Sequence, residues 1–458
     1  MNLTGILAFI FILGAAVILH EFGHFIVAKL LGIRVETFSV GFGKRIWGKR
    51  WGTTDYRLSL IPLGGYVKLG GDESNAGLEQ GGDSEIPTRE RFDLRPRWQK
   101  LAVGFAGPAM NVLTALAIPL VSAMTVGVPA TPSPVVSRVE ANGAAAAAGL
   151  RQGDRVVAFN GRENPTWRFI ENDALLAPEQ PIPVSVERDG KIVNATITPR
   201  KATRNGETYG VLGFNPDPGV LPVVVRAVEP DTPAAQAGLQ PGDKLLAIND
   251  EPVRNIEQTR QFIQENAGAL RLTVERAGKR ESLTTGENRL PENKLGVLFE
   301  PPPTETVGFG SALAYAFDLN VETLRLTGKA LGQVFSGQRS ARDTFSGPIG
   351  IARASSQAAN ELGWEGVFWM LAFLSLNLGI FNLLPIPVLD GGMIFMLLLE
   401  GALAWVGVKL SMTVRERIQQ VGFVFLLLLM SFVIINDITK TASLWKSSDN
   451  QPEAQQQK

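Results

Sequence analysis

The sequence has no cysteine and only two histidines among its 458 residues. Without cysteine, the chain cannot form a disulfide, a thiolate metal site or a cysteine nucleophile. It also lacks an excess of positive charge, because 44 basic side chains balance 44 acidic ones. Proteins that bind nucleic acid present a basic face, so we expect no nucleic-acid partner.

Both histidines lie in one apolar stretch, AAVILHEFGHFIVAKLLG, at residues 15–32. His20 and His24 are four residues apart, so on a helix they share one face and can bind one cation. Glu21 is one step round and can reach a water on that cation, as in the HExxH motif of zinc proteases. Two core histidines bonded to backbone carbonyls are the alternative, but ionisable groups at membrane depth are usually functional.

A third metal ligand is needed, because a catalytic zinc site has three protein ligands and an open place for water. No further histidine or cysteine exists, so this ligand must be a carboxylate. Asp390, in the segment NLLPIPVLDGG, is the natural candidate. We therefore predict one zinc ion per chain, held by His20, His24 and Asp390, with Glu21 as the catalytic base.

Four uncharged apolar runs are long enough to cross a bilayer, for which a helix needs about 20 residues. They are Leu3–Leu19, Leu101–Val136, Gly366–Leu389 and Ile418–Asn436. In the second run, prolines end any helix near Val128. We predict a polytopic α-helical membrane protein with four transmembrane helices, at residues 1–32, 100–128, 363–392 and 418–440.

The orientation follows from the basic residues that come after the first apolar run. Because Lys29, Arg34, Lys44 and others lie there, the segment 33–99 is predicted to be cytoplasmic. Both termini and residues 129–362 are then outside, and His20, His24 and Asp390 lie near the cytoplasmic side. A cleaved signal peptide is a weaker reading of the first run, since no basic residue precedes it.

The segment Asn377–Gly392 carries a second group of polar and helix-breaking residues. Pro385 and Pro387 cannot both lie in a regular helix interior, and irregular backbone at this depth lines protein or a water-filled cavity. Asn382 can donate to a substrate carbonyl or its oxyanion. The alternative is a kinked helix with a packing asparagine. We predict that these three residues contact substrate.

HEFGH, AGPAMN (residues 106–111) and NLLPIPVLDGG occur in this order, and this resembles the site-2 protease family of intramembrane zinc metalloproteases. The resemblance implies that His20, His24 and Asp390 are ligands, Glu21 is the base and Asn382 binds substrate. Many members carry a histidine after aspartate-glycine-glycine, where this chain has Met393. That histidine is not one of the family's ligands.

The predicted cytoplasmic segment contains strand-like sequence, with alternation over Tyr56–Leu60. It is either a small sheet that seals the helices or a membrane-associated β-hairpin that clamps an extended substrate strand. The family resemblance implies a re-entrant β-hairpin here. On that interpretation, Gly64, Gly65 and Tyr66 bind substrate.

The middle of the chain is duplicated, since residues 144–161 and 233–250 are identical at nine of 18 positions. Each copy resembles a circularly permuted bacterial PDZ domain, which predicts two inserted PDZ domains (α+β, β-rich) at 129–216 and 217–303. GVLGF, with Leu212, Gly213 and Phe214, resembles the carboxylate-binding loop of the second copy. The copies either capture peptide tails by β-augmentation or act as rigid spacers or size filters.

Three further segments complete the predicted organisation. They are periplasmic amphipathic helices at 304–362, a cytoplasmic connecting segment at 393–417 and a disordered tail at 441–458.

The resemblance implies a multi-pass inner-membrane endopeptidase that cuts transmembrane segments of other proteins. Its implied role is the second cut in an anti-sigma factor during an envelope stress response, with signal-peptide remnants as further substrates. The alternatives are a non-catalytic membrane scaffold that recruits envelope proteins through its PDZ pair, and an anchored metalloprotease with its site in water. The sequence leaves the oligomeric state open.

Overall fold

The computed structural model describes residues 3–72, 86–129, 133–204, 207–217, 219–266, 268–286, 294–300, 304–405, 407 and 411–449. The chain divides into two compact units. The first, which we call the helical unit, contains residues 1–124 and 308–458, and the second, the repeat unit, contains residues 125–307.

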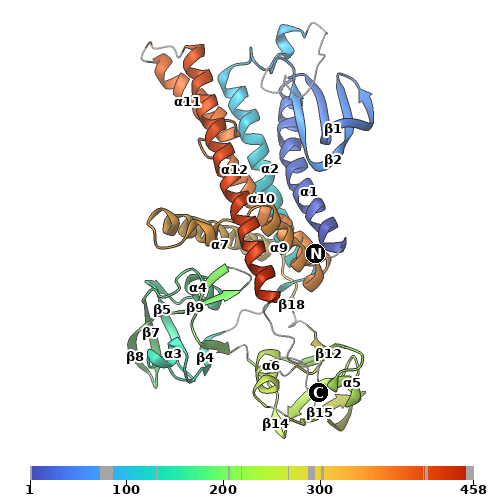
Figure 1. The fold of residues 1–458 in the computed structure, drawn as a ribbon, viewed down its shortest axis with the longest axis vertical. Helices are drawn as coiled ribbons and strands as arrows, with labels where there is room; N and C mark the ends of the chain where they lie inside the picture. The colour runs from blue at the N-terminus through green and yellow to red at the C-terminus, as the bar shows by residue number, and fades with distance from the viewer. Residues whose placement is uncertain are drawn as a thin grey trace. The chain divides into compact units, whose positions relative to one another are not determined.

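The helical unit is built from long apolar helices and one sheet (Figure 1). Its elements are α1 (Leu3–Leu30), β1 (Val35–Trp51), β2 (Thr54–Leu69), the 3-10 turn η2 (Thr88–Glu90), α2 (Arg97–Thr125), α7 (Phe309–Phe335), α8 (Ala341–Thr344), α9 (Pro348–Leu362), α10 (Trp364–Asn382), α11 (Asp390–Trp405) and α12 (Met412–Asp449). In Figure 1, α1, α2, α10 and α12 run along the long axis, whereas α7 lies across them.

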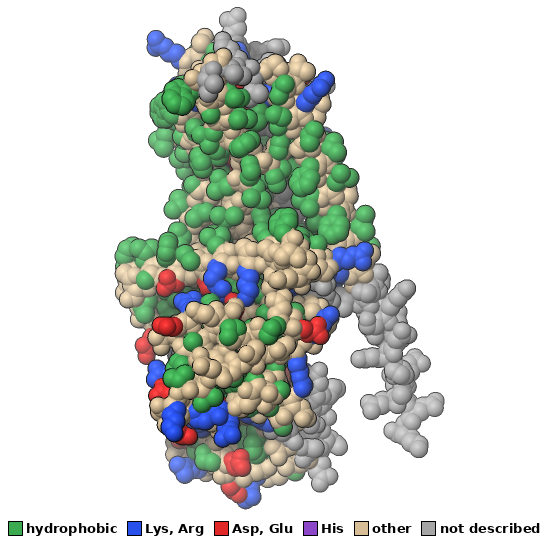
Figure 2. Space-filling view, turned by 90° about the vertical axis from the view of Figure 1, so that its left-hand side faces the viewer, with side chains coloured by type: hydrophobic (Ala, Val, Ile, Leu, Met, Phe, Trp, Pro, Cys, Tyr) green, Lys and Arg blue, Asp and Glu red, His purple; other side chains and the backbone are tan. Residues whose placement is uncertain are grey.

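Four of these helices, α1, α2, α10 and α12, are long and apolar enough to cross a membrane. Each of them overlaps one of the four predicted spans. The face of this unit that Figure 2 shows carries many hydrophobic side chains and few charged ones. Large apolar side chains of α12, such as Val421 and Leu428, are exposed. Exposed apolar surface of this extent is expected where lipid is the solvent.

Small residues let α1 pack closely against its neighbours. Ala8, Ile12 and Ala16 form a buried cluster with Val367 and Leu371 of α10. Two glycines of the same helix also lie against backbone: Gly14 against the Pro62 carbonyl of β2, and Gly23 against the Ala106 carbonyl of α2. Interfaces of this kind allow the dispersion contacts that hold helices together in lipid.

Helix α2 contains two internal prolines, Pro108 and Pro119. Proline has no N–H, so Pro119 leaves the carbonyl four residues earlier, on Ala115, without its helical partner. Asn320 of α7 donates to that carbonyl at 3.0 Å and is itself buried. The proline therefore creates the acceptor that fixes α7 against α2.

The C-terminal half of α12 is fixed by a buried carboxylate. Asp437 accepts hydrogen bonds from the backbone N–H groups of Gly347, Ile349 and Gly350, at 2.9–3.1 Å. These groups lie at the start of α9, where N–H groups have no partner within the helix. The carboxylate thus caps α9 from another helix.

Each of the two strands β1 and β2 is bent and pairs twice with the other. Phe38, for example, lies opposite both Val67 and Tyr56. The result is an antiparallel sheet of four rows. We call residues 44–51 the outer row, because they pair only with the start of β2, and residues 61–69 the inner row, because they lie beside α1. The predicted alternating segment Tyr56–Leu60 lies in β2.

The repeat unit contains two sheets of equivalent strand order. Its elements are β3 (Val128–Pro129), β4 (Ser133–Val139), α3 (Ala144–Ala147), β5 (Arg155–Phe159), β6 (Arg162–Glu163), α4 (Trp167–Leu175), β7 (Ile182–Arg188), β8 (Lys191–Ile197), β9 (Arg200–Arg204), β10 (Glu207–Val211), β11 (Phe214–Asp217), β12 (Val223–Val228), α5 (Pro233–Gln236), β13 (Lys244–Ile248), β14 (Glu251–Pro252), α6 (Ile256–Glu265), β15 (Arg271–Arg276), β16 (Lys279–Thr284), β17 (Val297–Phe299) and β18 (Thr304–Glu305).

The first repeat has the order β11-β4-β5-β7-β8, and the second has β17-β12-β13-β15-β16. Each repeat has its own buried core, centred on Phe159 and Ile170 in the first and on Ile248 and Leu272 in the second. The short strand pairs β9–β10 and β3–β18 lie outside these sheets.

One ion pair recurs in both repeats and explains part of their shared sequence. Asp154 binds Arg188, and Asp243 binds Arg276, each through two hydrogen bonds of 2.7 Å. Each arginine also donates to the carbonyl of the preceding glycine turn, Gly149 or Gly238. The aspartate of each Gly-Asp turn therefore connects the turn to a strand more than 30 residues away.

Three sequence expectations differ from the structure. The third predicted span ends at Asn382 rather than at residue 392, because Pro385 and Pro387 follow. The predicted connecting segment 393–417 contains most of α11. The tail predicted to be disordered from residue 441 continues α12 to Asp449, since no proline or glycine interrupts it. Residues 450–458 lie outside the described part of the chain.

We predict that Asp243→Asn destabilises the second repeat by about 2 kcal/mol, because a buried carboxylate loses charge-assisted hydrogen bonds. Hydrogen exchange over residues 223–299 of the full-length protein should accelerate. Asp250→Asn is the matched control, since its ion pair with Arg271 is largely exposed. Equal exchange in both variants would contradict the prediction.

The stability of the second repeat should depend on pH in a defined direction. The hydrogen bond from Arg276 lowers the pKa of the Asp243 carboxyl below its ordinary value. A lowered folded-state pKa stabilises the fold above the unfolded pKa of about 3.9. That stabilisation is lost as the pH falls through the folded-state pKa, and Asp243→Asn should not show this loss.

Candidate metal centre

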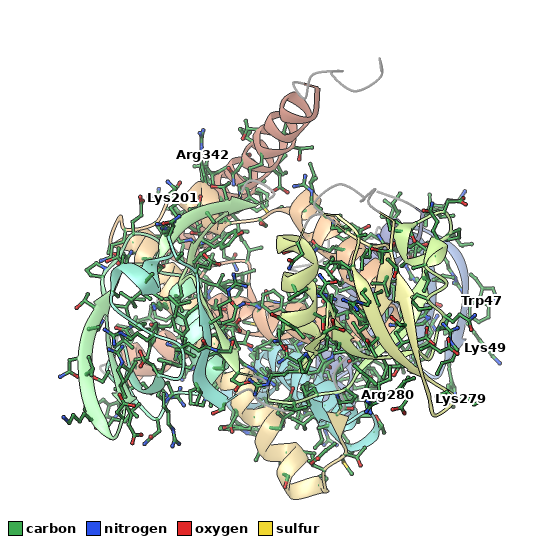
Figure 3. All side chains as sticks on the ribbon, turned by 90° about the horizontal axis from the view of Figure 1, so that it is seen from below. Trp47, Lys49, Lys201, Lys279, Arg280 and Arg342 are labelled. Atoms are coloured by element: carbon green, nitrogen blue, oxygen red, sulfur yellow. The ribbon has the colours of Figure 1, made fainter. Side chains whose placement is uncertain are left out.

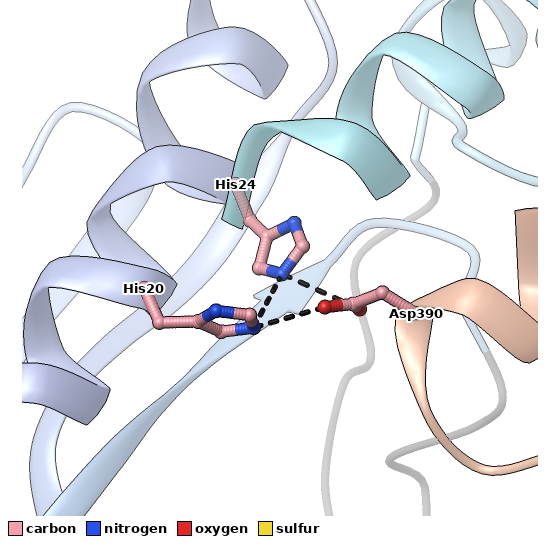
Figure 4. Close-up of side chains that lie close together, drawn as sticks. All are labelled: His20, His24 and Asp390. Atoms are coloured by element: carbon pink, nitrogen blue, oxygen red, sulfur yellow. Dashed lines mark hydrogen bonds and ion pairs between the residues drawn. The ribbon is translucent and has the colours of Figure 1, made fainter. Parts of the chain in front are cut away.

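Three potential ligands converge in the helical unit: His20 and His24 of α1, and Asp390, the first residue of α11 (Figure 4). The two histidine Nε2 atoms are 3.3 Å apart. Asp390 Oδ2 is 2.9 Å from His20 Nε2, and Oδ1 is 3.4 Å from His24 Nε2. The sequence prediction of these three side chains as one cluster agrees with this arrangement.

Asp390 reaches the histidines because the chain reverses sharply between α10 and α11. Gly391 lies against the carbonyls of Leu383 and Leu384, and Gly392 lies against that of Ile386. A Cβ at either glycine would be 2.3 Å from a carbonyl oxygen. The glycine pair after Asp390 is therefore required by the turn, which sets the aspartate at the start of a new helix.

A third helix approaches the histidines at Gly107 of α2. A Cβ on this residue would lie 2.3 Å from His24 Nε2 and 2.8 Å from His20 Cε1. No other residue type fits without moving an imidazole. Gly107 is part of the AGPAMN motif, and the sequence alone indicates no role for it.

The second ring nitrogen of each histidine also has a partner. His24 Nδ1 lies 2.7 Å from the Val103 carbonyl. A carbonyl can only accept, so Nδ1 carries the proton and Nε2 keeps its lone pair for a metal.

Asn111 plays the equivalent part for His20. Its amide nitrogen is 3.2 Å from His20 Nδ1, while its oxygen Oδ1 is buried and has no partner among the described residues. Turning the amide by 180° lets Oδ1 accept from His20 Nδ1–H and frees Nε2 for a metal. A lone asparagine in an apolar helix was the sequence signal for this residue.

The cluster fits a zinc ion by its chemistry and its spacing. Two imidazole nitrogens and one carboxylate are a known catalytic zinc ligand set, with one place left for water. Ligands that share a tetrahedral ion at about 2.0–2.1 Å are roughly 3.3 Å from one another, and the three separations are 2.9–3.4 Å. When both Nε2 atoms keep their lone pairs, the buried Asp390 Oδ2 has no donor among the described residues, and an ion would satisfy it.

Glu21 lies beside the ligands and is held by the sheet. Its Oε2 accepts a hydrogen bond of 3.0 Å from the backbone N–H of Val67, in the inner row of β2. A cavity of about 450 Å³ borders Glu21, His24 and Asp390, and its wall also includes Val67 and Glu400. A carboxylate next to a metal cluster and a cavity is placed to act as a general base.

The other predicted substrate residues take different places. The Asn382 amide nitrogen is 3.3 Å from His20 Nε2, so this side chain reaches the cluster. Pro387 borders the same cavity, whereas Pro385 and Pro387 together line an apolar groove against α12. In that groove, Pro387 packs on Gly422.

Gly64, Gly65 and Tyr66 all lie in the inner row. Gly64 packs against Phe42 and Val17, and Gly65 packs against the Ser39 carbonyl. Tyr66 stacks on Phe42. Both glycines are buried, so close packing explains them, and a contact of this row with substrate remains a prediction.

Leu212, Gly213 and Phe214 belong to the first repeat, so their assignment to the second copy is wrong. Phe214 begins β11, which pairs with β4, and the Leu212 carbonyl accepts from Ala145 N. The second repeat has its own equivalent, Leu295 to Val297, whose Leu295 carbonyl accepts from Ala234 N. The sequence KLGVLF was the signal for it.

We predict that Gly107→Ala lowers zinc affinity by about 10- to 100-fold, because the added methyl group displaces an imidazole. The bound metal can be measured by mass spectrometry of the purified protein after dialysis against a zinc buffer. Gly328→Ala in α7 is the control, since no atom lies within 4 Å of its Cβ position. Equal metal content in both variants would sink the prediction.

The comparisons with known proteins agree on one family for this chain. Peptidase family M50 matches residues 8–429 of this chain. "Regulator of sigma-E protease RseP" of Escherichia coli is 32% identical over 94% of this chain and 98% of its own length. Its Salmonella typhimurium counterpart is 33% identical over 96% and 99%.

A further relative, from Neisseria meningitidis, is provisionally named a zinc metalloprotease and is 32% identical over 95% of this chain and 99% of its own. Among solved structures, the PDZ domain of an SdrC-like protein from Listeria monocytogenes covers 17% of this chain and 85% of its own, with 18% identity and a TM-score of 0.16. The resemblance inferred from the three sequence motifs is confirmed, and the chain belongs to peptidase family M50.

Proposed function

We propose that this protein is an intramembrane zinc endopeptidase that cuts transmembrane segments of other proteins. The observation that carries the proposal is the convergence of His20, His24 and Asp390 beside Glu21. The ligands lie on α1, a helix apolar enough to span a membrane, and at the start of α11. One zinc ion per chain would be held by the three ligands.

When bound, zinc supplies a Lewis acid that makes water a nucleophile near neutral pH. Glu21 accepts the proton of the attacking water and later delivers it to the leaving amine. The hydrogen bond from Val67 N–H keeps one carboxylate oxygen occupied and so aims the other toward the cavity. Asn382 donates to the substrate carbonyl, where negative charge develops in the transition state.

The substrate must be extended before it can be cut, because a helix hides its peptide bonds behind its side chains. The inner row of β2, residues 61–69, has an edge beside the cluster, and Val67 of this row contacts Glu21. An unwound segment can add to such an edge by β-augmentation. We assign Gly64, Gly65 and Tyr66 to this clamp, and Pro385 and Pro387 to the opposite wall.

The basic residues that follow the first span place the sheet and the metal cluster toward the cytoplasm. The protein would then be a multi-pass protein of the bacterial inner membrane, surrounded by its lipids. Both termini and the repeat unit would lie in the periplasm.

The relatives' name, regulator of sigma-E protease, suggests the biological setting. The enzyme would make the second cut in an anti-sigma factor whose periplasmic part has already been trimmed, as part of an envelope stress response. Remnants of signal peptides, which are short apolar helices, are a further substrate class.

We assign the two repeats as PDZ domains. In each, the last strand, β11 or β17, is at the edge of its sheet and follows a glycine of positive φ, Gly213 or Gly296. Such an edge can accept a peptide tail by β-augmentation. The repeats can serve as peptide readers or as filters that exclude bulky, untrimmed substrates.

A non-catalytic scaffold that recruits envelope proteins through this pair is the competing function. It does not explain why two imidazoles, a carboxylate and Glu21 converge in an apolar setting, where each polar group has a desolvation cost. An anchored protease with its site in water does not explain the apolar flanks of His20.

The proposal is tested with purified protein and a detergent-solubilised single-helix substrate. We expect Glu21→Gln to retain zinc and lose cleavage, and Asp390→Ala to lose both. Asn382→Ala should retain zinc and lower kcat by about 10²- to 10³-fold. Wild-type protein that binds no zinc and cuts nothing would support the scaffold. A cut outside the apolar segment would support the anchored protease.

Deletion of residues 130–303 tests the role of the repeats. If they act as filters, the shortened protein should cut an untrimmed substrate that the full-length protein refuses, while both cut the trimmed form. Continued refusal of the untrimmed substrate would contradict the filter. Weaker binding of the trimmed form alone would favour the peptide reader.

A further inference from the structure

The outer row of the sheet contains basic and aromatic side chains that belong neither to a buried core nor to the metal centre. Between Thr37 and Thr54 the sequence has four basic residues and no acidic one, and all four lie in the outer row. Trp47 is 71% and Trp51 is 79% exposed. Figure 3 shows Trp47 and Lys49 projecting outward from the same part of β1. Exposed tryptophans of this kind mark an interaction surface.

The sheet runs along α1, so the position of a residue along the sheet corresponds to a depth in the membrane. Gly14 lies against Pro62, and 15 residues later Lys29 Nζ lies 3.5 Å from Thr53 Oγ1. At 1.5 Å per residue, the sheet follows about 22 Å of the helix. Its end beside Gly14 exposes apolar Leu60 and Ile61, at 62% and 48%. Lys49, Arg50 and Trp51 lie toward the other end, next to the turn at residues 52–53, where the apolar stretch of α1 finishes. Arg45 begins the row opposite Ser59, near the Gly14 end.

The side chain of Arg45 extends in the same direction, from the apolar end of the sheet toward its polar end. Its guanidinium extends along the strand past Gly48, where a Cβ would be 3.0 Å from Arg45 Nε. It ends 3.1 Å from Asp55, close to the turn, and Asp55 also binds Arg57. A cationic side chain that bends toward the polar end of its element is typical of residues at membrane depth.

From this gradient we infer that the outer row is a lipid-binding surface for anionic phospholipid headgroups of the leaflet that it faces. Lys49 and Arg50 would contact lipid phosphates, while Trp47 and Trp51 lie at the level where aromatic side chains favour the membrane interface. The net positive charge selects anionic lipid over an acidic protein, because the apolar side chains beside it continue to the depth of Gly14. The inference depends on the membrane orientation proposed above.

This contact would have a consequence for the metal centre. The outer and inner rows belong to the same sheet, and the inner row holds Glu21 through Val67. A headgroup contact on the outer row would therefore fix the position of the inner row along the membrane normal, and the inner row positions the general base Glu21.

The test uses full-length protein in nanodiscs of phosphatidylcholine with a minor fraction of brominated lipid, which quenches tryptophan on contact. We expect stronger quenching by brominated phosphatidylglycerol than by brominated phosphatidylcholine. Lys44→Gln/Lys49→Gln/Arg50→Gln should abolish the preference, with a loss of about fivefold in local enrichment for each basic side chain. Trp47→Phe/Trp51→Phe should remove the excess quenching, which locates it on this row.

The matched control is Lys201→Gln/Lys279→Gln/Arg280→Gln, which removes three exposed basic side chains from the repeat unit (Figure 3). It should keep the preference. Raising the salt concentration should weaken the preference of the wild-type protein, and this result does not depend on the folding of any variant.

Equal quenching by both lipids, or a preference that survives in the outer-row variant, would overturn the proposal. Equal quenching together with charge-dependent dimers in mass photometry would instead assign the row to a second copy of the chain. The quenching does not require proteolysis, so the lipid site can fail while the enzyme proposal stands, and the reverse.

Discussion

A bilayer interior offers no water to a polar group, and the helical unit is organised around this constraint. Two irregularities in its helices are each matched by a donor or acceptor from elsewhere in the chain. Pro119 frees a carbonyl, and Asn320 binds it. The start of α9 presents three free N–H groups, and Asp437 accepts from all of them. Polar pairing therefore determines which helices are neighbours, while apolar packing alone would leave several arrangements open.

In the metal centre, too, polar groups are paired with partners from other segments, and here several such pairs lie close together. Each histidine has its Nδ1 occupied, by Val103 or by Asn111, so that both Nε2 atoms face the same point. Three elements must meet within a few ångströms to achieve this, and glycines permit their approach at residues 107, 391 and 392. The site is thus specified as much by where side chains are missing as by the ligands themselves.

The metal ligands could be predicted from the sequence because two of them lie close together in one helix and the third was found by excluding other ligand types. The spacing of His20 and His24 is a property of one helix, and Asp390 followed from the lack of any other histidine or cysteine. The duplication was visible as direct identity. Contacts between distant segments left no such signal: nothing near Val67 indicates that its N–H binds Glu21, 46 residues earlier.

The errors have physical causes too. Hydropathy continued past Asn382, but the prolines stopped the helix; at residue 441 polarity rose, but no residue broke α12. The loop at Leu212 belongs to the first copy because the edge strand of that repeat comes at the end of its sequence, next to the start of the following copy.

The hydrogen bond between Val67 and Glu21 has a genetic consequence. The donor is a backbone N–H, which every residue except proline supplies. Side-chain substitutions at position 67 change the packing of a buried valine and leave the donor in place. A mutational scan of β2 would therefore register position 67 as a core residue, and its link to the catalytic carboxylate would stay hidden except in the proline variant.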